Sequence, residues 1–174
     1  MFKESRKEFL EKNEKVEYYK NVHQSINEFK DINFLLENSI INEICFNRNG
    51  CYIKLNDEFK QIKMFIDEKD FEEVPMSIVC FGNYESEETN MILKLMNLLQ
   101  KDDFTFFDIG ANLGWYSLNT LKRFQHAKVY SFEPSPNTYS RLKNNFSLNN
   151  LSIENIYNIG FFDKNGSMDF FYDQ

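Results

Sequence analysis

An acidic residue stands at the end of an apolar run, just before a loop of small and polar residues. The stretch FFDIGANLGWYSL places Asp108 at the end of that run, and Gly110, Asn112 and Gly114 follow at alternate positions. Glycines let a backbone approach a ligand closely, and the first N–H groups of the following helix attract an anion. The spacing G-x-N-x-G differs from the G-x-G-x-x-G of dinucleotide-binding loops. A carboxylate here would repel a pyrophosphate, whereas it suits a ligand with an ammonium group beside its carboxylate.

A second acid follows at the end of the next apolar run. Glu133 in VYSFEPSP lies 19 residues beyond Gly114. An acid at such a strand end can accept two hydrogen bonds from a ribose diol, as in nucleotide-binding α/β folds. A ligand that has an amino-acid end and a ribose is S-adenosylmethionine. The two motifs together therefore predict that cofactor.

The elements around these motifs alternate between strand and helix. The patterns predict strands at 104–109, 128–134 and 153–159, helices at 113–124 and 135–149, and a turn at 163–166 that leads into a further apolar segment. Pro136 stands at the start of the second helix, where proline is tolerated. Such alternation is the beginning of an open parallel α/β sheet, whose ligands bind outside the carboxyl ends of the strands. Because the run at 104–109 is wholly apolar, we expect that strand to be covered on both faces.

The first part of the chain has a different pattern. Apolar residues at spacings of three and four predict a helix over 2–38, with one apolar stripe that docks on the chain or on a second copy. Asn49-Gly50 predicts a hairpin of 41–46 with 51–55. Further short strands are expected at 61–66 and 76–81, and a helix at 86–99 with Ser86 as its N-cap. We therefore predict a helical and β-hairpin extension over 1–80 and an incomplete Rossmann-like domain over 81–174.

Composition narrows the class of partner. The formal net charge of −7 argues against a nucleic-acid backbone as partner. No apolar run is long enough for a membrane span, and the charged start does not fit the core of a signal peptide. Cys45, Cys51 and Cys80 fit no metal-ligand spacing, and the hairpin does not place the first two opposite each other. We expect reduced thiols, a cytoplasmic location and no metal.

Four segments resemble, in order, class I methyltransferases of the FkbM type: YESEETNMILKLM, FFDIGANLGWYSL, VYSFEPSPNTYSRLKNNFSLNN and NIGFFDKNGSMDFF. The resemblance implies that Asp108, Gly110, Asn112 and Gly114 line the methionine end of S-adenosylmethionine and that Glu133 holds its ribose. It also implies that residues near Asn158 lie by the adenine, and that Tyr84 and Glu85 close over the cofactor. The implied reaction is O-methyl transfer to a hydroxyl group of a sugar or other secondary metabolite.

Several points stay open. FkbM-type chains usually carry a Lys-Ile-Asp-x-Glu-Gly stretch on a later strand, and this sequence has none, so no catalytic base is predicted. We expect an N-terminal fragment whose strand 104–109 has an open edge, covered by the N-terminal helix, a β-segment or another chain. Trp115 and Tyr116 either wall the site or pack the helix, and His23 and His126 are not expected to be catalytic. The alternatives are a non-catalytic interaction module and an NAD-dependent oxidoreductase.

Overall fold

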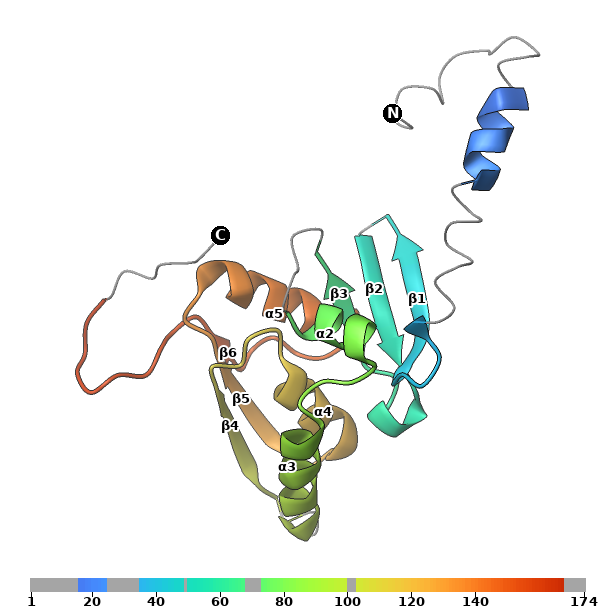
Figure 1. The fold of residues 1–174 in the computed structure, drawn as a ribbon. Coiled ribbons are helices and arrows are strands. Elements are labelled where there is room, and N and C mark those ends of the chain that lie inside the picture. The colour runs from blue at the N-terminus through green and yellow to red at the C-terminus, as the bar shows by residue number, and fades with distance from the viewer. Residues whose placement is uncertain (1–15, 25–34, 49, 68–72, 100–102, 168–174) are drawn as a thin grey trace.

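The computed structural model describes residues 16–24, 35–48, 50–67, 73–99 and 103–167. Its described part is an α/β fold with two small sheets, each of three strands (Figure 1). The first sheet has the order β1-β2-β3 and the second the order β4-β5-β6. The predicted change from hairpin strands to strand–helix alternation is therefore confirmed.

The first sheet is antiparallel. It consists of β1 (Ile41–Asn47), β2 (Gly50–Leu55) and β3 (Lys63–Ile66). Cys45 pairs with Tyr52 and Cys51 with Phe46, so the hairpin register keeps the two cysteines apart, as predicted. All three cysteines are free thiols.

The strand predicted at 76–81 is wrong, because this segment forms helix α2 (Val74–Phe81). Pro75 lies in its first turn, where the missing N–H has no partner to lose. Gly82 ends the helix in the left-handed conformation, and its N–H donates to the Ile78 carbonyl. The periodicity of a short apolar run cannot distinguish a strand from a buried helix. Here Pro75 and Gly82 at the two ends favour the helix.

The long N-terminal helix is seen in part. Residues 16–24 are helical, whereas 1–15 and 25–34 lie outside the described residues. Residues 36–38 form a turn with Asn38 at φ 56°, so the prediction of helix up to residue 38 is wrong there. Val16 and Tyr19 are exposed, so these two side chains do not show the expected docking on the rest of the chain.

Helix α3 (Ser86–Leu99) confirms the helix predicted at 86–99. Its first turn carries Glu87 and Glu88. Ser86 is not the expected N-cap, because it is the first helical residue and its hydroxyl donates to Asn83 Oδ1 at 2.9 Å.

The second sheet is parallel, as predicted. It consists of β4 (Thr105–Ile109), β5 (Lys128–Phe132) and the short β6 (Ile156–Tyr157), connected by α4 (Trp115–Arg123) and α5 (Pro136–Leu148). Ser135 is the N-cap of α5, and Pro136 is its first residue. Among the described strands, β4 pairs with β5 alone and is an edge of the sheet. The bend at 163–165 follows, and residues 168–174 lie outside the described part.

The expectation that 104–109 is covered on both faces is wrong in the described structure. Phe107 is 57% exposed and Ile109 59%, while Asp108 between them is buried. Two successive right-handed crossovers between adjacent strands place both helices on the same face of a parallel sheet. On the other face, the ring of Phe107 stacks on Tyr130, and Phe132 on Tyr157.

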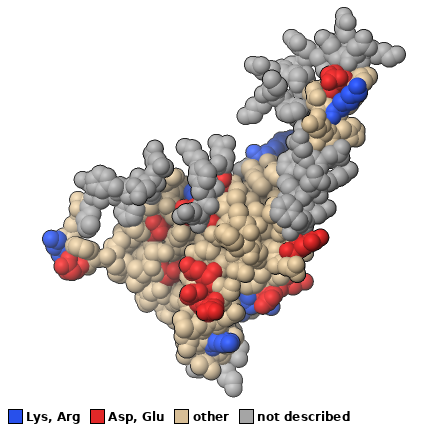
Figure 2. Space-filling model, viewed as in Figure 1, with Lys and Arg blue, Asp and Glu red and all other residues tan. Residues whose placement is uncertain are grey.

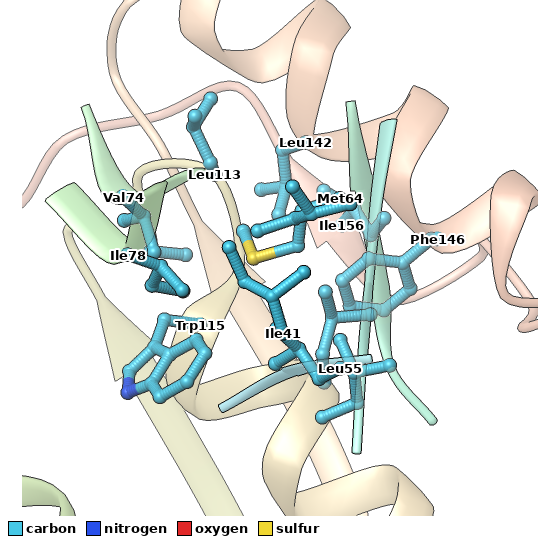
Figure 3. Packing of buried hydrophobic residues seen from close by; sticks show 14 residues of the cluster. Ile41, Leu55, Met64, Val74, Ile78, Leu113, Trp115, Leu142, Phe146 and Ile156 are labelled. Atoms are coloured by element: carbon cyan, nitrogen blue, oxygen red, sulfur yellow. The ribbon is translucent and has the colours of Figure 1, made fainter. Parts of the chain in front are cut away.

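One hydrophobic core joins the two predicted parts of the chain (Figure 3). Ile41, Leu55 and Met64 of the first sheet share this cluster with Leu142 and Phe146 of α5. Trp115 of α4 and Ile78 of α2 belong to it as well. The first sheet therefore packs against the helices that cover the second, and the domain division at residue 80 stays a prediction.

Candidate functional site

The loop after β4 lies at the carboxyl end of the parallel sheet. The N–H groups of Gly110 and Ala111 both donate to the Phe132 carbonyl at 2.9 Å, which ties the loop to the end of β5. Gly110, Asn112 and Gly114 have φ values of 79°, 47° and 92°. Glycine and asparagine are the residues that adopt this left-handed conformation most readily. The spacing G-x-N-x-G therefore marks alternating left-handed positions in this loop.

The two glycines of this loop have different surroundings. A Cβ atom added at Gly110 would meet nothing within 4 Å. One added at Gly114 would lie 2.6 Å from Leu142 Cδ1 and 3.3 Å from Phe146 Cε2 of α5. Gly110 therefore leaves space over the loop, whereas the small size of Gly114 is explained by packing against α5.

The Asp108 carboxylate is buried against the start of α4. Its Oδ2 atom accepts from the Ser117 N–H at 3.0 Å and from the Ser117 hydroxyl at 2.5 Å. Ser117 is the third residue of α4, and Gly114 at the N-cap position has no side chain to cap the helix. Asp108 therefore supplies the acceptor of an N-cap from the preceding strand, close to the positive end of the helix dipole. Burial raises the pKa of Asp108, the Ser117 hydrogen bonds oppose the shift, and the charge of Glu133 adds to it.

The Glu133 carboxylate connects two loops. Its Oε2 atom accepts from the Asn112 N–H and its Oε1 atom from the Ser135 N–H, both at 2.9 Å. The side chain is 6% exposed. Each carboxylate oxygen has a second lone pair, so both oxygens can accept a further hydrogen bond.

Tyr84 and Glu85 lie against the first turn of α4. The ring of Tyr84 makes an edge contact with Trp115, with centroids 5.7 Å apart. Glu85 has φ 40°, and its Oε2 atom accepts from the Tyr116 hydroxyl at 2.6 Å. Burial, followed by the hydrogen bond to Glu85, raises the pKa of Tyr84 to about 12.

Trp115 and Tyr116 differ in burial and in hydrogen-bond partner. Trp115 is buried, and its Nε1 donates to Thr89 Oγ1 of α3 at 2.8 Å, so it packs the helices. Tyr116 is half-buried and holds Glu85, and its pKa is raised by burial and by that carboxylate. In the sequence, Tyr116 could be recognised as a neighbour of the predicted site because it lies in the first turn after the glycine loop.

Asn158 follows β6 and reaches the same place. Its Nδ2 atom donates to the Glu133 carbonyl at 2.8 Å and to the Pro134 carbonyl at 2.9 Å. This side chain fastens the segment after β6 to the end of β5. The resemblance implied a place for Asn158 beside the adenine, and this stays a prediction; the structure shows the residue bonded to the backbone of Glu133 and Pro134.

The eight predicted residues thus form one neighbourhood at the carboxyl ends of β4, β5 and β6. Asn112 meets Glu133, Asn158 meets the carbonyl of Glu133, and Asp108 meets the start of α4. Tyr84 and Glu85 contact the first two residues of the same helix. On the face shown in Figure 2, acidic side chains gather near the start of α3, which carries Glu87 and Glu88.

A groove of about 590 Å³ lies elsewhere, between β3 and α5. It is lined by Phe65, Ile66, Asp67, Arg141, Asn144, Asn145, Ser147 and Leu148. None of these is one of the eight predicted residues. Within the described ranges, no cluster of three or more His, Cys, Asp or Glu side chains is placed to hold a metal ion. No helix of the described part combines the length and hydropathy needed to cross a bilayer.

Two curated proteins share a stretch of sequence with this chain. It is 33% identical over 51 residues to "Methyltransferase 1" of Beauveria bassiana (strain ARSEF 2860), which is 29% of this chain and 20% of that protein. It is 43% identical over 42 residues to "Methyltransferase sdnD" of Sordaria araneosa, which is 24% of this chain and 16% of that protein. The chain therefore matches at most a fifth of the length of these relatives. No protein-family model and no solved structure matches the chain.

Proposed function

We propose that this chain carries the cofactor-binding part of an S-adenosylmethionine-dependent methyltransferase. One observation carries the proposal. The residues predicted from two separate motifs meet in one hydrogen-bonded neighbourhood at the carboxyl ends of parallel strands, where α/β folds bind ligands. The similarity to two proteins named methyltransferases supports the general activity.

The residues of this neighbourhood fit the two ends of the cofactor. Asn112 Oδ1 is buried and has no hydrogen-bond partner among the described residues, so it offers an acceptor to the ammonium group of the methionine end. Gly110 leaves room for that end over the loop. Asp108 fixes the start of α4 beneath the methionine end, and Gly114 lets the loop lie close to α5.

The other end of the cofactor would meet Glu133 and Asn158. Each Glu133 oxygen keeps a second lone pair beside its bond to a backbone N–H, and these lone pairs suit the two ribose hydroxyls. Asn158 would hold the segment after β6 beside the adenine. Tyr84 and Glu85 would close over the cofactor from the segment before α3, with Glu85 held by Tyr116.

When bound, S-adenosylmethionine supplies an activated methyl group on its sulfonium. The chain's own residues would orient the cofactor and exclude water, which is the main protein contribution to such a displacement. The acceptor that we propose is a hydroxyl group of a sugar or other secondary metabolite. No residue of this chain is assigned as the base that takes the hydroxyl proton.

Four further parts of the proposal rest on the sequence. The second sheet is the start of a Rossmann-like methyltransferase sheet of the FkbM type, and residues 1–80 extend it. The protein acts in the cytoplasm with its three thiols reduced. It does not bind nucleic acid. A second copy or partner chain covers the open edge of β4.

Titration calorimetry with S-adenosylhomocysteine tests the proposal. Gly110 is a cleaner position to alter than Glu133, whose carboxylate also holds two backbone N–H groups. We expect the wild-type chain to bind and Gly110→Ala to bind at least about tenfold more weakly, because the new Cβ enters the space for the ligand.

Gly50→Ala is the matched control, since Gly50 also has a positive φ and open space around its Cβ position but lies in the β1–β2 hairpin. It should lose about 1 kcal/mol of stability and keep its affinity. Absence of binding by folded wild-type chain would refute the proposal. Tight binding of NADH in place of S-adenosylhomocysteine would favour the oxidoreductase.

A further inference from the structure

Asn145 of α5 and Asn149, the C-cap of the same helix, bind the outer edge of strand β3. The Asn145 Oδ1 atom accepts from the Phe65 N–H at 2.9 Å, and the Asn149 Oδ1 atom accepts from the Lys63 N–H at 2.9 Å. The Asn149 amide also donates to the Lys63 carbonyl at 2.6 Å. Four residues of helix rise about 6 Å and two residues of strand about 6.8 Å, so the two pairs match in spacing. Side chains from the last turn and the C-cap of α5 thus take the place of a further strand beside β3.

Asn145 differs from Asn149 in what its other end contacts. The Asn145 Nδ2 atom donates to the Leu113 carbonyl at 2.9 Å, within the loop between β4 and α4. Asn145 is 1% exposed and Leu113 is fully buried. One amide side chain therefore connects the backbone of the first sheet with the backbone of the predicted cofactor loop.

The same face of α5 also supports the next residue of the loop. Gly114 lies against Leu142 and Phe146 so closely that a Cβ atom would clash with Leu142. The remaining anchors of the loop, Phe132 and Glu133, belong to the second sheet and the residue after it. Asn145 is the anchor that reaches the first sheet through a hydrogen bond.

We propose that Asn145 is a positioning residue for the cofactor loop and makes strand β3 part of the support of the methyl-donor site. The proposal concerns the loop itself, and its effect on affinity rests on the proposed function. The first sheet therefore contributes to cofactor binding, in addition to any role in placing an acceptor. Loss of the Asn145–Leu113 bond leaves a buried carbonyl unpaired and frees the loop to move.

Asn145→Asp separates the two bonds of this side chain. At a pH where it is ionised, an aspartate retains an acceptor for the Phe65 N–H but has no donor for the Leu113 carbonyl. Asn149→Ala is the matched control, because it removes the Lys63 contacts made by the C-cap of the same helix and leaves the Leu113 contact in place. Both are compared with wild type at a temperature where each is fully folded.

Amide exchange without ligand is the first measurement. We expect amides of the 110–114 loop to exchange at least about tenfold faster in Asn145→Asp than in Asn149→Ala, since only the former loses a loop anchor. The second measurement is affinity for S-adenosylhomocysteine, which should fall by about tenfold in Asn145→Asp and remain near wild type in Asn149→Ala. Equal loop exchange in the two variants would overturn the inference even if the wild type binds no cofactor.

A third measurement needs no variant and covers the case in which Asn145→Asp does not fold. Coupling between two sites is reciprocal. Binding of S-adenosylhomocysteine to the wild-type chain should therefore slow exchange of the Phe65 amide more than that of the Lys63 amide. Equal changes at the two amides, in a chain that binds the ligand, would contradict the role of Asn145.

Discussion

At the scale of single residues, the loop after β4 shows how one stretch serves both fold and site. Its two glycines and one asparagine take left-handed φ values that most residues avoid. The acid before them caps α4, and the carbonyl of Leu113 between them meets α5. The residue types that suggested a ligand site are therefore also explained by the backbone conformation of the loop and by the cap of α4.

Asn112 has a left-handed backbone conformation and a side-chain oxygen without a hydrogen-bond partner among the described residues. Substitutions can test the two features separately. Asn112→Gly should retain stability within about 0.5 kcal/mol, because glycine adopts the same φ, and should weaken S-adenosylhomocysteine binding about tenfold. Asn112→Val should lose about 2 kcal/mol, because a β-branched residue is strained at positive φ. Urea unfolding and calorimetry measure the two effects. Unchanged affinity in Asn112→Gly would remove Oδ1 from the site.

Asp108 makes stability depend on pH in a direction opposite to most carboxylates. Since burial raises its pKa above the ordinary 3.8, its contribution is fully present below that value and is lost as pH rises through the folded pKa. The Asp108→Asn variant lacks this loss. Its free energy of unfolding, relative to wild type, should therefore increase from about pH 3 to about pH 7. A constant difference over this range in urea titrations would contradict the raised pKa.

At the scale of elements, the start of α4 is held from several sides. Asp108 binds its third residue, Thr89 of α3 binds Trp115, and Glu85 binds Tyr116. The parallel sheet supplies the Asp108 contact. Helix α3 and the loop before it supply the contacts of Thr89 and Glu85. The segment before α3 therefore belongs to the neighbourhood of the loop although it is more than twenty residues away in sequence.

The packing of α4 on α5 gives a prediction that distinguishes the two loop glycines. Gly114→Ala should lose about 2 to 4 kcal/mol of unfolding free energy, because the added methyl group overlaps Leu142 and the residue has positive φ. In Gly110→Ala only the positive φ is unfavourable, so this variant should lose about 1 kcal/mol of unfolding free energy. Thermal and urea unfolding of both variants give the comparison. Equal losses would show that α5 yields to the new methyl group.

At the scale of the whole molecule, the second sheet has one face covered by helices and one face that is exposed at β4. Helices α4 and α5 cover the face that bears Asp108, whereas Phe107 and Ile109 of β4 remain exposed. Parallel sheets are ordinarily covered on both faces, and an exposed apolar edge strand favours association with another chain.

We therefore predict concentration-dependent self-association in sedimentation experiments. Ile109→Lys should shift the chain towards monomer, because it places a charge on the exposed face of the edge strand. Leu98→Lys is the control, since Leu98 is also exposed but lies on α3. A wild-type chain that remains monomeric across the concentration range would contradict the prediction.

Local patterns predicted most elements correctly where each depended on short-range chemistry. The Asn49-Gly50 hairpin, the proline start of α5 and the strand–helix alternation from 104 to 157 are read from neighbouring residues. The strand expected at 76–81 and the N-cap expected at Ser86 were wrong. In the first case a short apolar run suits either element. In the second the helix begins at Ser86 itself, so the N-cap position lies one residue earlier.

What the sequence determined by itself was the set of candidate residues, because left-handed loop positions and strand-end acids restrict the residue type locally. Only the tertiary structure decided which residues contact each other. Asn145 gave no signal, since its two partners, Phe65 and Leu113, lie 80 and 32 residues away. The burial of Trp115 and the exposure of Phe107 were likewise set by which helices cover which face. A single side chain carries its own chemistry, but its contacts depend on elements brought together from distant parts of the chain.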